Sequence, residues 1–137
     1  MQEVRLKQGE LTQRLAESLQ PRQDIVFAYL FGSAAESDVF EDVDVGIYLK
    51  GTVRDGFGYS VALSGELERV LGYRVDVILM NTALDQIIYH ITRGVLLVNN
   101  DDDLRADVVT LAWKRYWDFA FVRDNYLRDV AEGASQP

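Results

Sequence analysis

The sequence predicts a single domain of the α/β or α+β class. Segments with the apolar patterns of strands alternate along the chain with segments of helical period. The 137 residues are the usual size of one domain, and the 48% that are hydrophobic can build a packed core without disulfides or metal. No internal repeat, low-complexity tract or interdomain linker interrupts the pattern. We therefore expect one domain over residues 1–137, with its core at about 10–100.

The first part of the chain is predicted to hold one helix and two strands. Apolar side chains in residues 4–19 recur on one helical face, and a proline ends the run. They are Val4, Leu11, Leu15 and Leu19. Residues 25–31, IVFAYLF, form a continuous apolar run that is typical of a buried strand. Residues 42–49 alternate with a period of two, so one side of this strand is apolar and the other carries Asp42 and Asp44.

The middle of the chain is predicted to alternate helix, strand and helix. Residues 57–71 have a helical pattern that Gly72 ends, with apolar positions at Phe57, Val61, Leu67, Val70 and Leu71. Residues 74–80, RVDVILM, form a third strand with Asp76 on the side opposite to its valines. Residues 82–93 have a second helical pattern, through Leu84, Ile87, Ile88 and Ile91.

The C-terminal part is predicted to be a short strand followed by a long helix. Residues 95–98, VLLV, form the strand, and the helix runs from about 103 to 130. The three aspartates at 101–103 precede this helix, where the positive end of the helix dipole favours them as caps over a metal site. The tail from residue 131, AEGASQP, is predicted to be frayed.

Charge and composition exclude several classes of protein. Fourteen basic and twenty-two acidic residues give a formal net charge of -8, whereas proteins that follow a nucleic-acid backbone are usually basic. Direct nucleic-acid binding is therefore disfavoured, although acidity is equally common in ordinary soluble domains. The absence of cysteine excludes disulfides and thiolate metal sites and is consistent with a cytoplasmic protein. No apolar run approaches the roughly 20 residues of a membrane span, and the charged N-terminal residues are not expected to act as a signal peptide.

Acidic residues on two of the predicted strands indicate a metal site. Asp42 and Asp44 lie two positions apart and project from the same face, and Asp76 lies on the polar face of the third strand. If these strands are neighbours, three carboxylates converge, and they repel one another unless a cation lies between them. Magnesium prefers oxygen ligands and is commonly held by one or two carboxylates together with substrate phosphates.

The Gly32-Ser33 pair follows the first strand directly and is a candidate phosphate-binding turn. Glycine lets a phosphate approach the backbone closely, and the amides and the serine hydroxyl supply hydrogen-bond donors. A Gly-Ser pair alone is more often a simple turn, and an Asp-x-Asp alone is more often a solvated strand edge. The combination of both, in this order and on these elements, is far more specific.

The stretch LFGSAAESDVFEDVDVGIYL, followed by VDVILMN, resembles the minimal nucleotidyltransferase (MNT) family of the DNA polymerase β superfamily. The chain is most similar to the MNT antitoxins that are paired with HEPN ribonuclease toxins. The resemblance covers residues 10–100 and extends more loosely through the last helix. It implies a nucleotidyltransferase fold, which is a short mixed β-sheet flanked by helices, here with a long C-terminal helix. It also implies transfer of AMP from Mg²⁺-ATP to a hydroxyl, such as a tyrosine of the HEPN toxin.

The resemblance also implies roles for individual residues. Gly32 and Ser33 match the nucleotide-binding Gly-Ser, Asp42 and Asp44 match the metal-binding and nucleotide-binding Asp-x-Asp, and Asp76 matches the third catalytic and metal-binding carboxylate. Two magnesium ions would then clamp the triphosphate, and Asp76 would bind the second ion or take the proton of the acceptor.

Two features differ from the family motif and leave other functions open. Eight residues separate Gly-Ser from Asp-x-Asp where the family has ten, and Glu36 and Asp38 occupy a region where a basic residue is usual. One alternative is a catalytically weakened binding module that neutralises its partner by forming a complex. Another is a small-molecule transferase of the antibiotic-modifying type, a class that usually carries a further substrate domain.

Two further features of the sequence have both a functional and a structural interpretation. His90 is the only histidine, and its place in an apolar helical pattern predicts a packing or surface residue. Aromatic side chains cover more of the last helix than one core-facing stripe requires. They predict either an interface with a HEPN partner or a second copy, or a helix buried on two sides. The candidate interface residues are Trp113, Tyr116, Trp117 and Phe121.

Overall fold

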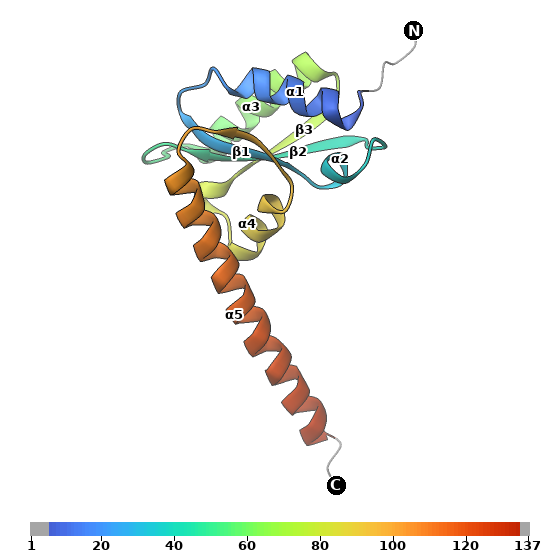
Figure 1. Cartoon of the computed structure of the whole chain (residues 1–137), viewed down its shortest axis with the longest axis vertical. Helices are drawn as coiled ribbons and strands as arrows, with labels where there is room; N and C mark the ends of the chain where they lie inside the picture. The colour runs from blue at the N-terminus through green and yellow to red at the C-terminus, as the bar shows by residue number, and fades with distance from the viewer. Residues whose placement is uncertain (1–5, 135–137) are drawn as a thin grey trace.

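A four-stranded mixed β-sheet with helices on both faces forms the body of the molecule (Figure 1). The computed structural model describes residues 6–134. The strands have the order β3-β2-β1-β4, in which β1 is antiparallel to β2 and β4, and β2 is parallel to β3. Their bounds are β1 Ile25–Phe31, β2 Asp42–Leu49, β3 Arg74–Leu79 and β4 Val95–Asn99. The predicted fold class is confirmed.

Helices α1 (Gln8–Leu19) and α3 (Gly56–Leu71) cover one face of the sheet (Figure 1). Every side chain of β1 is buried, as its continuous apolar run predicts. The apolar side of β2 packs into this core together with leucines spaced four apart on both helices. These leucines are Leu11, Leu15 and Leu19 of α1 and Leu63, Leu67 and Leu71 of α3. Val4, which the sequence pattern placed in the first helix, lies outside the described residues.

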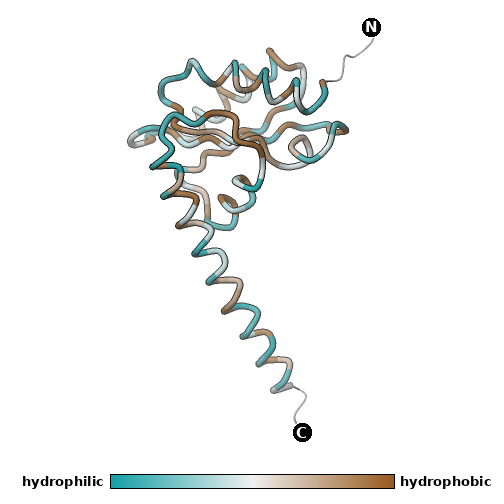
Figure 2. Tube along the Cα trace, viewed as in Figure 1, coloured by the Kyte–Doolittle hydropathy of each residue, from teal (hydrophilic) through white to brown (hydrophobic). Residues whose placement is uncertain are grey.

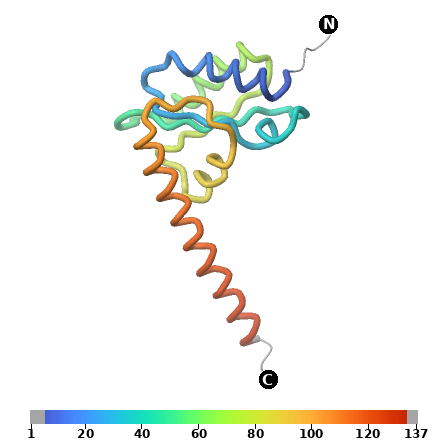
Figure 3. Tube along the Cα trace, in the orientation of Figure 1, coloured from blue at the N-terminus to red at the C-terminus, as the bar shows by residue number. Residues whose placement is uncertain are grey.

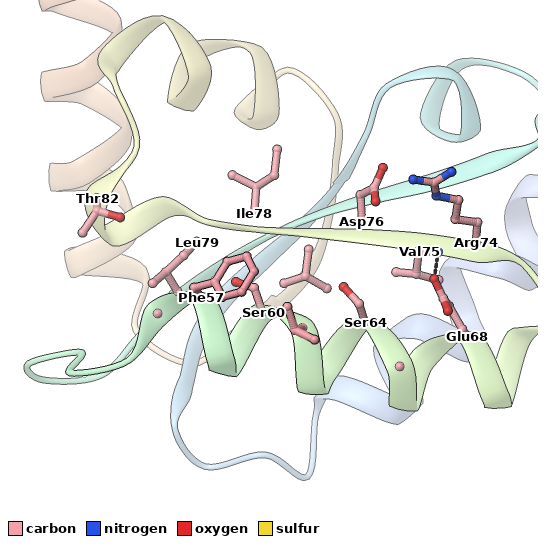
Figure 4. Close-up of a pocket in the computed structure, with 14 residues that line it drawn as sticks. Phe57, Ser60, Ser64, Glu68, Arg74, Val75, Asp76, Ile78, Leu79 and Thr82 are labelled. Atoms are coloured by element: carbon pink, nitrogen blue, oxygen red, sulfur yellow. Dashed lines mark hydrogen bonds between the residues drawn. The ribbon is translucent and has the colours of Figure 1, made fainter.

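The predicted apolar face of α3 was partly wrong. Phe57, Val61 and Val70 are 83%, 55% and 56% exposed, and only the leucine positions reach the core. Spacings of three and four residues fit more than one face of a 16-residue helix, so the pattern alone could not choose between them. Phe57 and Val61 instead lie along the outer side of β3 (Figure 4).

The opposite face of the sheet is covered by α4 (Asp85–Thr92) and the first part of α5 (Asp102–Ala134). A 3₁₀ turn, η1 (Met80–Thr82), takes up the last residue of the predicted third strand and the first residue of the predicted helix 82–93. Helix α4 begins at Asp85, three residues later than predicted. Ile88 and Ile91 are buried beneath α4, whereas Leu84 and Ile87, also predicted for this face, are 64% and 37% exposed.

Gly46, in the middle of β2, determines how closely α4 can approach the sheet. A β-carbon at this position would lie 2.5 Å from Cγ2 of Ile91 and 3.2 Å from its Cδ1. Any larger residue would therefore push α4 outward or force Ile91 from its position. The absence of a side chain here allows α4 to pack directly on the strand that carries Asp44.

Helix α5 has 33 residues and is about 50 Å long. The carboxylate of Asp101 accepts a hydrogen bond from the Leu104 amide at 3.0 Å, which confirms the predicted capping. The helix continues to Ala134, so the prediction of a frayed tail was wrong for residues 131–134, where two alanines favour helix. Residues 121–134, which we call the projecting segment, extend away from the body (Figures 1 and 3).

Hydrophobic residues recur along the projecting segment as well as in the body (Figure 2). Phe121, Val122, Tyr126, Leu127 and Val130 are each at least half exposed. No helix in the described part of the chain combines the length and the apolar character that crossing a bilayer would require.

Candidate active site

The parallel pairing of β2 and β3 brings the predicted carboxylates together. Asp44 lies directly opposite Asp76 in the register, and Asp42 lies opposite Arg74. Neighbouring strands are about 4.8 Å apart, so two residues in register on the same face are close neighbours. Figure 4 shows Asp76 pointing from β3 to the side of the sheet opposite α3. The alternation in β2 places Asp42 and Asp44 on this same side.

The Gly32-Ser33 turn lies beside Asp44, because Phe31 at the end of β1 pairs with Asp44 across the sheet. Gly32 has φ 74° and ψ -155°, a conformation that is essentially restricted to glycine. A β-carbon on Gly32 would also lie 2.5 Å from Oδ2 of Asp44. Both the backbone conformation and the close approach of this carboxylate therefore require glycine.

An open pocket of about 520 Å³ adjoins this turn. Its lining includes Ser33, Asp42 and Asp44, so three of the predicted site residues share one pocket. Ser33 begins the short helix α2 (Ser33–Glu36), is exposed, and donates no side-chain hydrogen bond within the described residues. Its hydroxyl is consequently available to a ligand.

Asp76 lines a second, larger groove of about 740 Å³ along the outer side of β3 (Figure 4). Ser60 and Ser64 of α3 also line the groove, and a carboxylate oxygen of Glu68 accepts a hydrogen bond from the Val75 amide at 3.0 Å. The structure thus divides the predicted carboxylates between two hollows. Asp44, in the first hollow, is in register with Asp76, in the second.

Repulsion among the carboxylates is visible at Asp44. Burial raises the pKa of Asp44, and the charges of Asp76 and then Asp42 raise it further, whereas His90 lowers it. A cation held between these groups would relieve the repulsion, and the donor set, which is all oxygen, fits magnesium. Within residues 6–134 no three ligand-type side chains are close enough to hold a metal by themselves. Phosphate oxygens of a substrate would therefore have to complete the coordination.

His90 also lies at this site, which its sequence context did not indicate. It is exposed, as predicted for a packing or surface residue, and its ring meets Phe31 edge-on at 5.6 Å between ring centroids. His90 and Asp44 are more than 40 residues apart in the sequence, and they become neighbours only because α4 packs on the sheet. The only sequence feature that could have indicated a role for His90 is its i, i+3 spacing with Arg93, which places both on the side of α4 opposite the buried isoleucines.

The aromatic residues of α5 divide into two groups. Trp113 donates a hydrogen bond to Oγ1 of Thr92 at 2.7 Å, and the Tyr116 ring stacks on Tyr89 with centroids 4.0 Å apart. These two side chains attach α5 to α4. Trp117 touches the edge of Tyr89 but is 56% exposed, and Phe121 is 69% exposed.

A mixed sheet with a Gly-Ser turn beside carboxylates on adjacent parallel strands defines the chain as a nucleotidyltransferase-fold protein. Residues 13–103 match the polymerase beta nucleotidyltransferase family, and the chain belongs to that family. No curated protein sequence matches the chain significantly.

Chains in solved toxin–antitoxin structures have the same fold. One is the structure of a tri-AMPylated Shewanella oneidensis HEPN toxin in complex with its MNT antitoxin, with a TM-score of 0.68, 17% identity, and coverage of 90% of this chain and 98% of that chain. A toxin–antitoxin structure with AMP-PNP gives a TM-score of 0.69, 17% identity and coverage of 88% and 98%. The MntA-HepT complex gives a TM-score of 0.65, 15% identity and coverage of 88% and 97%. At these identities the similarity shows a shared fold.

Proposed function

We propose that this protein is an MNT-type antitoxin that transfers AMP from Mg²⁺-ATP to a tyrosine hydroxyl of a HEPN-type toxin. The observation that carries the proposal is the register of Asp44 with Asp76 beside the Gly32-Ser33 turn. The fold relatives support it, because one of them is a complex with an AMPylated HEPN toxin and another contains AMP-PNP.

In this proposal each group of the site has a defined task. Asp42 and Asp44 would hold magnesium, which neutralises charge on the triphosphate when it is bound. The Gly32-Ser33 turn would hold phosphate oxygens through its amides and hydroxyl. The acceptor oxygen attacks the α-phosphorus, the bond between the α-phosphorus and the bridging oxygen breaks, and pyrophosphate leaves. Asp76, exposed in the groove beside β3, takes the proton of the attacking hydroxyl.

The exposed aromatic residues of α5 supply the surface for the partner in this proposal. Trp117 lies at the margin of the aromatic cluster that attaches α5 to α4, and both Trp117 and Phe121 are more than half exposed. Exposed aromatic side chains of this kind are common anchors of interfaces. Trp113 and Tyr116, the other two candidates, would support that surface from within the chain.

A second candidate is a binding module that neutralises the toxin by complex formation alone. It is favoured by Glu36, an exposed carboxylate in a cleft next to Gly32, where negative charge opposes a triphosphate. Both candidates use the same partner and the same fold, and they differ only in whether the carboxylates are needed.

The deciding experiment is transfer of label from α-labelled ATP in the presence of magnesium, with a HEPN-type protein as acceptor, the first candidate being any that a neighbouring reading frame encodes. Wild type and Asp44→Asn are compared, with Asp107→Asn on the exposed surface of α5 as a matched control. Label that appears on the partner with wild type and Asp107→Asn, but not with Asp44→Asn, supports the transferase. A stable complex without label would instead support the binding module, and neither label nor complex would contradict both.

A further inference from the structure

A small cleft opens on the other side of Gly32, at the C-terminal end of α4. Its volume is about 140 Å³, and its lining includes Gly32, Glu36, His90 and Arg93. Because Gly32 also adjoins the carboxylate of Asp44, the cleft and the candidate active site share a wall.

The end of α4 is held firmly at this place. A β-carbon on Gly94 would lie 2.0 Å from the Leu30 carbonyl oxygen, so the chain turns from α4 into β4 in direct contact with the end of β1. The His90 ring packs edge-on against Phe31, and the Arg93 guanidinium lies 5.6 Å from the centre of the Tyr89 ring. Both side chains are thus positioned by aromatic neighbours although they are exposed.

Apart from the contact of Arg93 with the Tyr89 ring, the polar groups of these two side chains have no hydrogen-bond or ion-pair partner in the described part of the chain. Among the described residues, neither His90 nor Arg93 makes a hydrogen bond or an ion pair, in contrast to Arg22 and Arg105, which both do. An arginine guanidinium offers planar, paired donors that suit phosphate oxygens. His90 acts electrostatically on Asp44, where it opposes the rise in pKa that burial and the neighbouring carboxylates cause, so the cleft lies within electrostatic reach of the carboxylates.

We propose that the cleft between α2 and the end of α4 binds the terminal phosphates of the nucleotide, with Arg93 and His90 as the donors. The inference rests on the proposed function and identifies the part of the chain that receives the pyrophosphate. A volume of 140 Å³ is well below the roughly 300–1,000 Å³ of pockets that enclose a whole drug-sized ligand, and it suits a phosphate group better than a nucleoside. Glu36 on the opposite wall repels this anion and favours its release.

The test compares the affinities of ATP, AMP and inorganic pyrophosphate for the wild type and four variants in the presence of magnesium, by calorimetry. Arg93→Gln and His90→Gln replace the guanidinium and the imidazole by an amide that cannot carry charge. Glu36→Gln removes the opposing charge, and Arg14→Gln on the far side of α1 is the matched control. Loss of a charge-assisted contact should weaken ATP and pyrophosphate about tenfold or more and leave AMP unchanged. Glu36→Gln should strengthen ATP and pyrophosphate, which is the opposite sign.

Each other outcome has a definite meaning. Equal losses for ATP and AMP would place the nucleoside in the cleft, and no change in Arg93→Gln and His90→Gln would mean that phosphate binds elsewhere; both overturn the inference. If wild type binds pyrophosphate but not ATP, and Arg93→Gln loses it, the cleft stands and the proposed function fails. If wild type binds neither compound, both fail. Thermal unfolding of each variant, which should match wild type because these side chains are exposed, verifies the fold.

Discussion

At the scale of single residues, Asp44 is the point where three elements meet. It lies on β2, opposite Asp76 of β3, and its carboxylate leans over the turn that follows β1. Its raised pKa records a carboxylate that is desolvated and surrounded by like charge when no cation is present. The residue that we propose to bind the metal is therefore also the one whose ionisation is disfavoured in the folded protein.

The first prediction is that Asp44→Asn abolishes transfer while it stabilises the metal-free protein. In the proposed mechanism Asp44 holds magnesium, so its replacement should lower the rate at least about a hundredfold, because charge stabilisation by a bound metal is worth several kcal/mol. The folded pKa of Asp44 lies above its unfolded value, so ionisation costs stability as pH rises through the interval between them. Thermal unfolding without metal should show a variant advantage at pH 7 that disappears at pH 3. A variant less stable than wild type at pH 7 would contradict this account.

The second prediction concerns the glycines with positive φ. Gly32→Ala introduces both a strained backbone and a β-carbon 2.5 Å from Asp44 Oδ2, whereas Gly51→Ala has φ 75° but no atom within 4 Å of the new β-carbon. We expect both to lose about 1–2 kcal/mol of stability from backbone strain, and only Gly32→Ala to lose nucleotide transfer as well. Denaturant unfolding and the transfer assay measure the two effects. Equal activity in both variants would show that the close approach to Asp44 is dispensable.

At the scale of elements, the strands could be predicted closely and the helix faces could not. The period of two in β2 and the continuous apolar run of β1 leave one reading each, and both strands have the predicted bounds. In α3 several apolar residues share the helical period, and only tertiary packing selected the leucine stripe over Phe57 and Val61. The 3₁₀ turn before α4 could not be predicted from the sequence, because a single turn of three residues is too short to show a helical period.

The third prediction concerns the start of α5. Asp101→Ala removes the side chain that accepts from the Leu104 amide, and the loss of such a cap should cost about 1 kcal/mol. Asp103→Ala removes a charge from the same turn without breaking a hydrogen bond, so it should cost less. Urea unfolding of both variants tests the difference. If Asp103→Ala costs as much as Asp101→Ala, the effect is general electrostatics and not capping.

At the scale of the whole molecule, the candidate site lies beside α2 at one end of the sheet, and the projecting segment extends from the layer of α4 and α5, on the face of the sheet that carries the carboxylates (Figure 1). The sequence could predict that the three carboxylates lie together, since the period of two places them on the polar faces of their strands. The prediction needed only the assumption that β2 and β3 are neighbours, which the structure confirms. The sequence could not predict that His90 and Arg93 line a cleft beside these carboxylates, because their position depends on the path of α4 across the sheet. The periodicity of apolar residues shows which face of a helix or strand is buried, but it does not show which other element that face contacts.

The fourth prediction concerns the partner surface. Trp117→Ala and Phe121→Ala should each weaken binding of the HEPN-type partner about tenfold or more, as truncation of an aromatic anchor does. Val70→Ala, which is also exposed but lies on α3 outside the groove that contains Asp76, should leave binding unchanged. Calorimetric titration of the partner and thermal unfolding of each variant separate binding from stability. Partner affinity that is unchanged in the α5 variants would place the interface elsewhere.

Gly46 gives the molecule a spacer of fixed thickness. It lies in the middle of β2 and has no contact with a ligand in the proposed mechanism. Because it has no side chain, Ile91 of α4 packs directly against β2, and this contact sets the distance between α4 and the carboxylates. Its replacement by alanine would insert one methyl group beneath Ile91 and tilt or lift the helix that carries His90 and Arg93. A substitution in the middle of β2 would thus alter the opposite wall of the proposed site. The distance between the carboxylates of β2 and the side chains of α4 depends on residue 46 having no β-carbon.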